Sequence, residues 1–378
     1  MIYLDNAATT RPNREATERA LSCLNEDFYN PSALYREGFA QKRGIEEARE
    51  SLLSHIAPDG GVSLIFTACG SEADNQALFS FARKGNLVIT GGEHSAVHAA
   101  AGELKNRGTE LRVAPLRPDG SADAEALLRL VDGNTSMVSV IHVNNETGAA
   151  NDVNAIAEAV KAKNPRTVFH SDGVQAFGKI PYTLGECVDL YAVSAHKIGG
   201  IKGVGGLFAR KKAYAALRPL IYGGGQESGR RSGTENVFGI RQFQFAAERK
   251  FSGLTADLGR LKGLRERFWE ALDSDIFTRI SPEEGSPYIL SVAARGLRGE
   301  TLLHMLDDRG VIVGTGSACS SNAKRQYSRV ILACGVPKEL AEGIIRVSFS
   351  CDTAEEEALE GARALNECAK ILRKRMNA

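Results

Sequence analysis

An alternation of short apolar runs with helix-like segments, from Val62 to Phe208, constrains the fold of this chain more than any other feature. The apolar runs are SLIFT, NLVITG, LRVAPL, TSMVSVIHV, RTVFHSD, DLYAVSA and GGLFAR. Polar or Gly-rich turns and helical stretches such as AEALLRLV and VNAIAEAVKA separate them. Strands that alternate with helices predict an α/β fold whose mostly parallel sheet is covered on both faces. Ligands of such sheets bind at the carboxyl ends of the strands, so functional side chains are expected there.

The length of the chain, 378 residues, predicts two domains, because a single hydrophobic core rarely grows this large. A long amphipathic stretch from Gly239 to Leu272 leads out of the α/β region. Short strand-like and helix-like segments follow it, among them YILSVAAR, VIVGTG and ELAEGIIRVSF. We therefore predict a large domain over residues 15–255, and a smaller α+β domain formed by residues 1–14 and 256–378.

Composition narrows the class of function. The 47 basic and 46 acidic side chains give a net charge of +1, which argues against nucleic acid as the main ligand. No run approaches the roughly 20 apolar residues that cross a bilayer, and MIYLDNAATT does not have the pattern of a signal peptide. We therefore expect a cytoplasmic protein without a membrane segment. The seven cysteines are scattered and form no CxxC pair, so neither a disulfide framework nor a metal site is expected.

One lysine stands where a parallel sheet binds its ligand. In DLYAVSAHKIGG, Lys197 follows an apolar run and precedes a Gly-rich turn. An amine in such a crevice can form a Schiff base with a carbonyl cofactor. Ser194 and His196, beside it, could both donate to a phosphate. Taken alone, however, the segment fits a solvated surface lysine better.

The segment HSDGVQAFGKIP carries Asp172 and Gln175 at the end of the preceding apolar run. A carboxylate beneath a pyridine ring keeps the ring nitrogen protonated, so that the ring can accept electrons. Gln175 could hydrogen-bond a ring hydroxyl. A turn or helix-cap aspartate is the alternative for Asp172. An aspartate at the end of one strand, with Lys197 at the end of the next, favours the pyridine cofactor.

Three further segments place polar groups after apolar runs. In SLIFTACGSEADN, Gly70 and Ser71 are expected to cradle a phosphate, although Ser71 with Asp74 also fits a helix-capping box. In GGEHSAVHAA, His94 could lie on a cofactor ring and move protons, or be a hydrogen-bonded loop residue. In HVNNETG, Asn145 could hold a substrate, although Asn-rich turns are common without function.

A set of segments in one order over nearly the whole chain resembles a known family. They are YLDNAATT, FTACGSEADN, EHSAV, HVNNETG, HSDGVQAFGKIP, SAHKIGG, GGGQESGRRSGTEN, GTGSACSS and IIRVSFS. Together they resemble the cysteine desulfurases of the iron–sulfur-assembly type, in the class V aminotransferase group of fold type I enzymes. The resemblance implies pyridoxal 5′-phosphate (PLP) as cofactor and L-cysteine as substrate. It also implies a large domain with a mostly parallel seven-stranded sheet between helices, plus a smaller α+β domain.

The resemblance implies a role for each matching residue around the cofactor. Lys197 matches the Schiff-base lysine, Asp172 the partner of the ring nitrogen and Gln175 the contact of the ring hydroxyl. His94 matches the histidine stacked on the ring. The phosphate cup is matched by Gly70, Ser71, Ser194 and His196. Thr234 matches a threonine that reaches the phosphate bound in the other subunit, which implies a homodimer.

Other implied roles concern the substrate and its sulfur. Asn30, Asn145 and Arg346 match substrate-binding residues, with the guanidinium on the substrate carboxylate. From the residues alone, Arg346 also fits an ordinary surface ion pair. Cys319 lies among small residues in VIVGTGSACSSNAKRQYSRV, the setting of an exposed loop thiol. In the resembled family this cysteine attacks the substrate's sulfur and keeps it as a persulfide for a sulfur-acceptor protein.

The match has departures at Tyr29, Tyr35, Cys69, Ser350 and Cys351, where the family usually has other residues. They leave the acceptor open among an iron–sulfur scaffold, a tRNA-thiolation protein and a cofactor-biosynthesis enzyme. Two other class V activities, an aminotransferase and a selenocysteine lyase, stay open as alternatives. A catalytically inactive partner scaffold is the alternative from a different class of protein.

Overall fold

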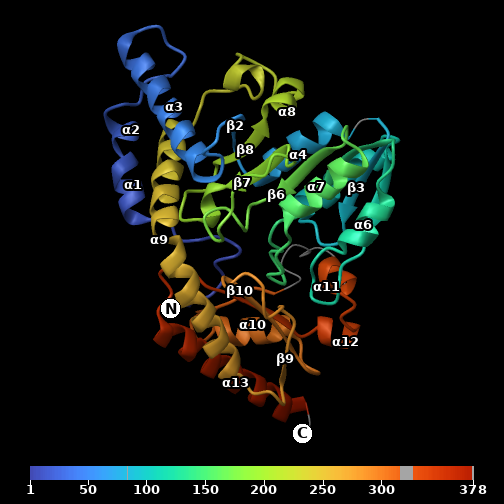
Figure 1. Ribbon diagram of the computed structural model, residues 1–378. Helices are drawn as coiled ribbons and strands as arrows, with labels where there is room; N and C mark the ends of the chain where they lie inside the picture. Colours follow the sequence, from blue (N-terminus) through green and yellow to red (C-terminus); the bar gives the residue numbers. More distant parts are fainter. Residues whose placement is uncertain (83, 316–326, 377–378) are drawn as a thin grey trace.

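The structure is a computed structural model that describes residues 1–82, 84–315 and 327–376. The described strands form sheets of seven, three and two strands. Figure 1 shows the seven-stranded sheet with helices packed around it, and strands β9 and β10 in a second region near both chain termini. The long helix α9 (Val237–Glu270) runs from the first region into the second.

All the apolar runs between Val62 and Phe208 form strands of one sheet. These strands are β2 (Val62–Thr67), β3 (Asn86–Thr90), β4 (Glu110–Ala114), β5 (Thr135–Ser139), β6 (Val168–Asp172), β7 (Leu190–Ser194) and β8 (Gly205–Arg210). Their order across the sheet is β2-β8-β7-β6-β5-β3-β4. Strand β8 runs antiparallel to β2 and β7, and the other neighbours are parallel. The predicted α/β class with a mostly parallel seven-stranded sheet is confirmed.

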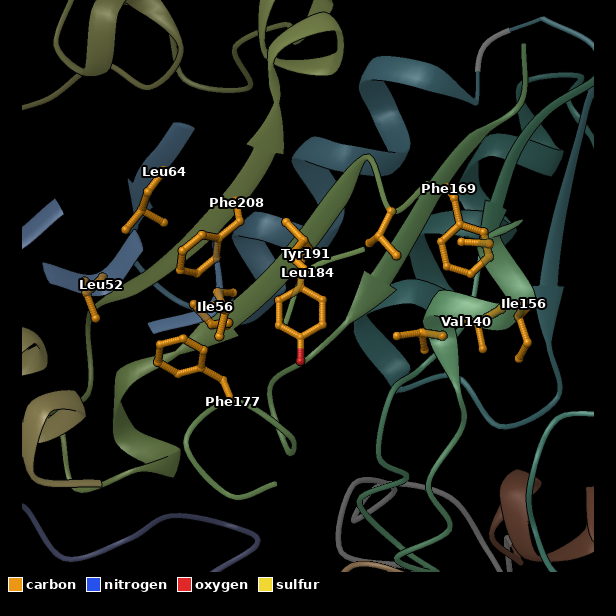
Figure 2. Packing of buried hydrophobic residues seen from close by; sticks show 14 of the residues in the cluster. Leu52, Ile56, Leu64, Val140, Ile156, Phe169, Phe177, Leu184, Tyr191 and Phe208 are labelled. Atoms are coloured by element: carbon orange, nitrogen blue, oxygen red, sulfur yellow. The ribbon is translucent and has the colours of Figure 1, made fainter. Parts of the chain in front are cut away.

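Helices cover both faces of this sheet, as its continuous apolar strands predict. They are α3 (Arg36–Ile56), α4 (Gly70–Phe81), α5 (Ser95–Asn106), α6 (Ala124–Leu130), α7 (Val153–Lys163) and α8 (Lys211–Ala216). In β3, Val88 belongs to the core under α3, α6 and α7, whereas Leu87 and Ile89 belong to the core under α4, α5 and α8. Figure 2 shows the first core, in which Tyr191 and Phe208 pack between the sheet and its helices.

The smaller region has the predicted α+β character. Its elements are β1 (Ile2–Tyr3), β9 (Phe277–Arg279), β10 (Ile289–Ala294), α10 (Gly299–Asp307), β11 (Val311–Ile312), α11 (Arg329–Ala333), α12 (Lys338–Ala341), β12 (Ile344–Ser348) and α13 (Glu355–Met376). The antiparallel sheet has the order β12-β10-β9. Strand β1 pairs in parallel with β11, so the first residues of the chain lie with its C-terminal part.

Helix α9 connects the two regions as one continuous helix of 34 residues. Its first half packs on α1 (Arg14–Ala20) and α3, and Phe268 near its end belongs to the core of the smaller region. Because α9 passes through residue 255 without a break, a domain boundary there stays a prediction. The short helix α2 (Ser22–Asn25) and the 3-10 turns Ala195–Lys197 and Glu227–Gly229 complete the described helices. In this part of the chain, no helix is both long and apolar enough to cross a membrane.

Two glycine-to-alanine substitutions test the packing of the large region. A Cβ on Gly173 would lie 2.0 Å from Cζ of the buried Tyr191 ring, whereas a Cβ on Gly102, in α5, would meet nothing within 4 Å. Gly173→Ala should therefore lower the free energy of unfolding by about 3 kcal/mol or more through overpacking. Gly102→Ala should raise it by about 0.5–1 kcal/mol, because alanine is the better helix former. Urea denaturation measures both, and equal effects would contradict the packing described for Tyr191.

Candidate active site

A cavity opens at the carboxyl ends of the strands of the large sheet. Strands β6 and β7 pair in parallel, with Asp172 opposite Ala192, so their ends meet at one edge. The N-terminus of α4 reaches the same cavity, whose empty volume is about 540 Å³. Most of the residues predicted for the site line it, namely Gly70, Ser71, His94, Asn145, Asp172, Gln175, Ser194, His196 and Lys197.

Lys197 lies in the 3-10 turn directly after β7. Its Nζ donates to the backbone carbonyls of Ala7 and Ala8, each at 2.7 Å. The N-terminal segment of the chain therefore holds the amine at the cavity. The sequence does not predict this contact, because a backbone carbonyl has no residue signature.

Asp172 is the last residue of β6 and is 3% exposed. Its Oδ1 accepts the N–H of Val174 at 2.9 Å. Burial raises the pKa of Asp172, while the nearby His94 and Lys197 lower it. A buried carboxylate of this kind is stabilised by a cationic partner in the cavity it faces.

His94 caps the N-terminus of α5 with its own ring. Its Nδ1 accepts the N–H of Ala96 at 3.2 Å, so the neutral ring carries its proton on Nε2. Burial lowers the pKa of His94, and Asp172 acts in the opposite direction. The imidazole is therefore neutral at pH 7 and can exchange a proton at Nε2.

Behind the cavity lies a buried acidic cluster that the sequence does not predict. Asp74, on α4, lines the cavity, and its Oδ1 lies 3.4 Å from Nε2 of His170. His170 Nδ1 lies 2.9 Å from Ser139 Oγ, which donates to Glu93 Oε2 at 3.3 Å. Burial raises the pKa of Asp74, and raises that of Glu93 to about 8. Raised values favour the neutral acids, which limits the negative charge that builds up beside the cavity.

Groups that suit a phosphate gather at the start of α4. This 12-residue helix begins at Gly70 without a side-chain cap, so the capping box considered for Ser71 and Asp74 is wrong. The free N–H groups of a helix N-terminus attract an anion. Ser194 Oγ is buried at the same cavity and has no hydrogen-bond partner among the described residues. A Cβ on Gly70 would lie 2.7 Å from Val174 Cγ2, so the close approach requires glycine.

Arg346, in β12 of the smaller region, does not line the cavity itself but contacts Asn145, which does. One terminal nitrogen donates to the carbonyl of Asn145 at 2.9 Å, and the other pairs with Asp5 Oδ1 at 2.7 Å. The Arg346 side chain is 9% exposed, so an ordinary surface ion pair is excluded. Its buried Nε has no hydrogen-bond partner in the described part of the chain. The sequence places Asp5 in a family segment but does not indicate that it pairs with Arg346.

Other predicted site residues do not line this cavity. Thr234 lines a separate cavity together with Glu227 and Arg231. Asn30 is exposed, and its Oδ1 accepts the N–H of Ser32 at 2.9 Å. The contact of Thr234 with the phosphate of a second subunit and the substrate contact of Asn30 therefore stay predictions.

Cys319 lies outside the described residues. The described residues on both sides of it are fixed close to the cavity. The N–H of Gly314 donates to the Arg346 carbonyl at 2.9 Å, and the Ser328 hydroxyl donates to the Glu146 carboxylate. Arg329 donates to the carbonyls of Gly91 and Glu93, next to His94.

Comparison with known proteins agrees with this geometry. The family Aminotransferase class-V matches residues 2–360. A cysteine desulfurase IscS of Dictyoglomus turgidum is 36% identical over 365 residues, which cover 94% of this chain and 91% of the relative. A cysteine desulfurase of Cereibacter sphaeroides is 37% identical over 362 residues, which cover 92% of this chain and 90% of the relative.

Solved structures extend the likeness to the whole fold. A NifS-like protein superposes with a TM-score of 0.90 and is 34% identical, covering 98% of this chain and 100% of that chain. A NifS-like protein from Rickettsia africae has a TM-score of 0.88 and is 27% identical, with 98% of this chain covered. The resemblance seen in the sequence is thereby confirmed. The chain belongs to the class-V aminotransferase family and, within it, to the PLP-dependent cysteine desulfurases.

Proposed function

We propose that this chain converts L-cysteine to L-alanine with PLP, and that it passes the sulfur through Cys319 to an acceptor protein. One observation carries the proposal: Lys197 and Asp172 lie in one cavity, at the ends of adjacent strands, beside a helix N-terminus that fits a phosphate. The relatives named cysteine desulfurase support the same activity.

PLP fits the groups that line the cavity. Ser71, Ser194 and His196, with the N–H groups at the start of α4, would hold its phosphate. Asp172 would keep the ring nitrogen protonated, and Gln175 would bind the ring hydroxyl. When bound, PLP supplies an electron sink for the electron pair released at the α-carbon of the substrate.

The chain's own groups would orient the substrate and move its protons. Arg346 would bind the substrate carboxylate with N–H groups that remain unused, because Asp5 and the Asn145 carbonyl each accept only one N–H of a terminal nitrogen. Lys197 Nζ would remove the α-proton and return it, since it is the amine at the cavity. His94 would direct its Nε2–H into the cavity as a hydrogen-bond donor.

The sulfur step would move one sulfur atom from substrate to enzyme. The Cys319 thiolate attacks the sulfur of bound cysteine, so an S–S bond forms while the Cβ–S bond of the substrate breaks. The electron pair of the broken bond stays with the carbon, which takes up a proton and leaves as alanine. The enzyme is left with a persulfide that an acceptor protein removes. The anchoring of Gly314 and Ser328 beside the cavity supports this role for Cys319.

We further propose a homodimer in which Thr234 completes the phosphate site of the second copy. Thr234 lies outside its own cofactor cavity, on a loop whose Glu227 carboxylate pairs with Arg49 at 2.8 Å. Tyr222, before the same loop, is 80% exposed, and Leu34 is 88% exposed. Large exposed apolar side chains of this kind suit a protein interface. A cytoplasmic location stays a prediction.

Two substitutions separate the roles of Lys197 and Cys319. Lys197→Ala should abolish the visible absorbance of the lysine-bound cofactor, because no amine remains to bind it. Cys319→Ala should keep that absorbance but release alanine from cysteine at least about 100-fold more slowly. Cys23→Ser, on α2, is the matched control and should behave as wild type. Undiminished cysteine turnover by Cys319→Ala would remove the sulfur-acceptor role, and amino transfer to a 2-oxo acid would favour an aminotransferase.

Ser194→Ala tests the phosphate site through binding and stability together. The Ser194 hydroxyl lacks a partner in the described structure, so its removal should change the unfolding free energy of the apoprotein by less than about 0.5 kcal/mol. The dissociation constant of PLP should rise about tenfold or more, because a hydrogen bond to a charged group is lost. In the matched variant Ser139→Ala, which loses contacts to His170 and Glu93, stability should fall by about 1–3 kcal/mol. Unchanged PLP affinity in Ser194→Ala would contradict the phosphate site.

Asp5→Ala tests how Arg346 is oriented. Loss of the 2.7 Å ion pair should raise the KM for cysteine about tenfold while kcat changes much less, since the pair serves substrate binding. Steady-state kinetics of alanine release give both constants. Asp59→Ala, at an exposed turn, is the control. A fall in kcat at unchanged KM would show that Asp5 acts elsewhere in the reaction.

A further inference from the structure

A second cavity, with an empty volume of about 840 Å³, lies behind the segment that carries Lys197. Ile198 and Gly199 line one side of it, and Lys250 and Cys351 another. Lys250 belongs to α9, whereas Cys351 lies in the turn between β12 and α13. The Lys250 Nζ and the Cys351 Sγ are 2.8 Å apart. This pair lies outside the cofactor cavity and has no part in the reaction derived above.

Lys250 is buried, and no carboxylate of the described residues pairs with it. It is 7% exposed, and within the described residues the hydrogen-bond acceptor of its Nζ is the Cys351 sulfur. A buried ammonium is costly unless an anion compensates it. The Cys351 sulfur is the acceptor that the structure offers, and the thiolate is the reactive form of a cysteine.

Besides Lys250, two arginines lie close to Cys351. Arg260 donates to the Cys351 carbonyl at 2.5 Å, and Arg249 is already paired with Asp352 at 3.0 Å. Lys250 Nζ also lies 5.8 Å from the Tyr288 ring centroid. Cationic surroundings and access from a cavity are the two conditions that make a cysteine prone to oxidation.

We propose that Lys250 and Cys351 form an oxidation-dependent covalent cross-link, in which one oxygen atom joins Nζ to Sγ. Dioxygen is the oxidant. The ammonium, the thiolate and one dioxygen molecule give the N–O–S bridge and one water. Two N–H bonds and the O–O bond break, one N–O and one O–S bond form, and the second oxygen leaves as water. Nitrogen and sulfur each lose two electrons, and dioxygen takes up all four.

The separation of the two atoms favours an oxygen bridge over a direct bond. At 2.8 Å, nitrogen and sulfur are too far apart for a single bond between them, yet close enough for one small atom to link both. The link would tie α9 to the turn after β12, the strand that carries Arg346. Residues 250 and 351 are 101 positions apart, so the closed loop is long, and the constraint on the unfolded chain is correspondingly large.

Peptide mapping of the full-length protein tests the cross-link. Air-exposed protein, digested with trypsin without reductant, should yield the Lys250 and Cys351 peptides joined, one oxygen heavier and two hydrogens lighter than their sum. Cleavage after Lys250 should be lost, because its amine is modified, and dithiothreitol should restore it. Separate peptides after air exposure would overturn the proposal. A joined pair without the added oxygen would overturn the oxygen bridge.

Thermal unfolding of the same samples gives an independent readout. The melting temperature of the oxidised protein should exceed that of the reduced protein by about 5 °C. This difference should vanish in Cys351→Ser and in Lys250→Arg, and should persist in Cys23→Ser. A difference that persists in Cys351→Ser would contradict the assignment. Neither readout uses catalytic activity, so the test is independent of the proposed function.

Discussion

The parallel pairing of β6 with β7 is the constraint on which the site depends. It fixes Asp172 and the turn that carries Lys197 at one edge of the sheet, because parallel strands end on the same side. Both strands are buried on both faces, so neither can slip by one residue without moving its apolar side chains out of two cores. The distance between the acidic and the basic group is thus set by the hydrophobic packing of the large region. The side chains at this edge are therefore held in place by a rigid sheet.

The N-terminal segment joins this rigid edge to the smaller region. The carbonyls of Ala7 and Ala8 accept from Lys197, and the Gln175 amide donates to the Ala7 carbonyl at 2.8 Å. Two residues earlier, Asp5 holds Arg346. A short stretch of chain therefore contacts both the amine proposed to bind the cofactor and the guanidinium proposed to bind the substrate. A movement of the smaller region would therefore change the hydrogen bonds of Lys197 to this segment.

Much of this organisation could be predicted from the sequence, because it depends on local pattern. Each apolar run became a strand, and polar residues that follow the runs came together at the expected edge, from Ser71 to Lys197. The antiparallel direction of β8 could not be predicted, since a buried run reads the same in either direction. The long amphipathic stretch gave no sign of whether it forms one helix or two, and α9 is one.

Contacts between residues far apart in the chain could not be predicted from the sequence. Asp5 and Arg346 are 341 positions apart, and neither residue type signals its partner. Asp74 fitted a capping box by spacing, but burial beside His170 decides its position. Lys250 and Cys351 meet only because α9 crosses into the smaller region. Propensity and spacing describe neighbours along the chain, whereas these contacts follow from packing.

Borohydride reduction tests whether Lys197 and Asp172 act on one and the same cofactor. Reduction fixes PLP to the amine that holds it, and peptide mass spectrometry then identifies that amine. We expect a single modified lysine, Lys197, with labelling strongly diminished in Asp172→Ala. Modification of another lysine, such as the buried Lys179, or full labelling of Lys197 in Asp172→Ala, would contradict it.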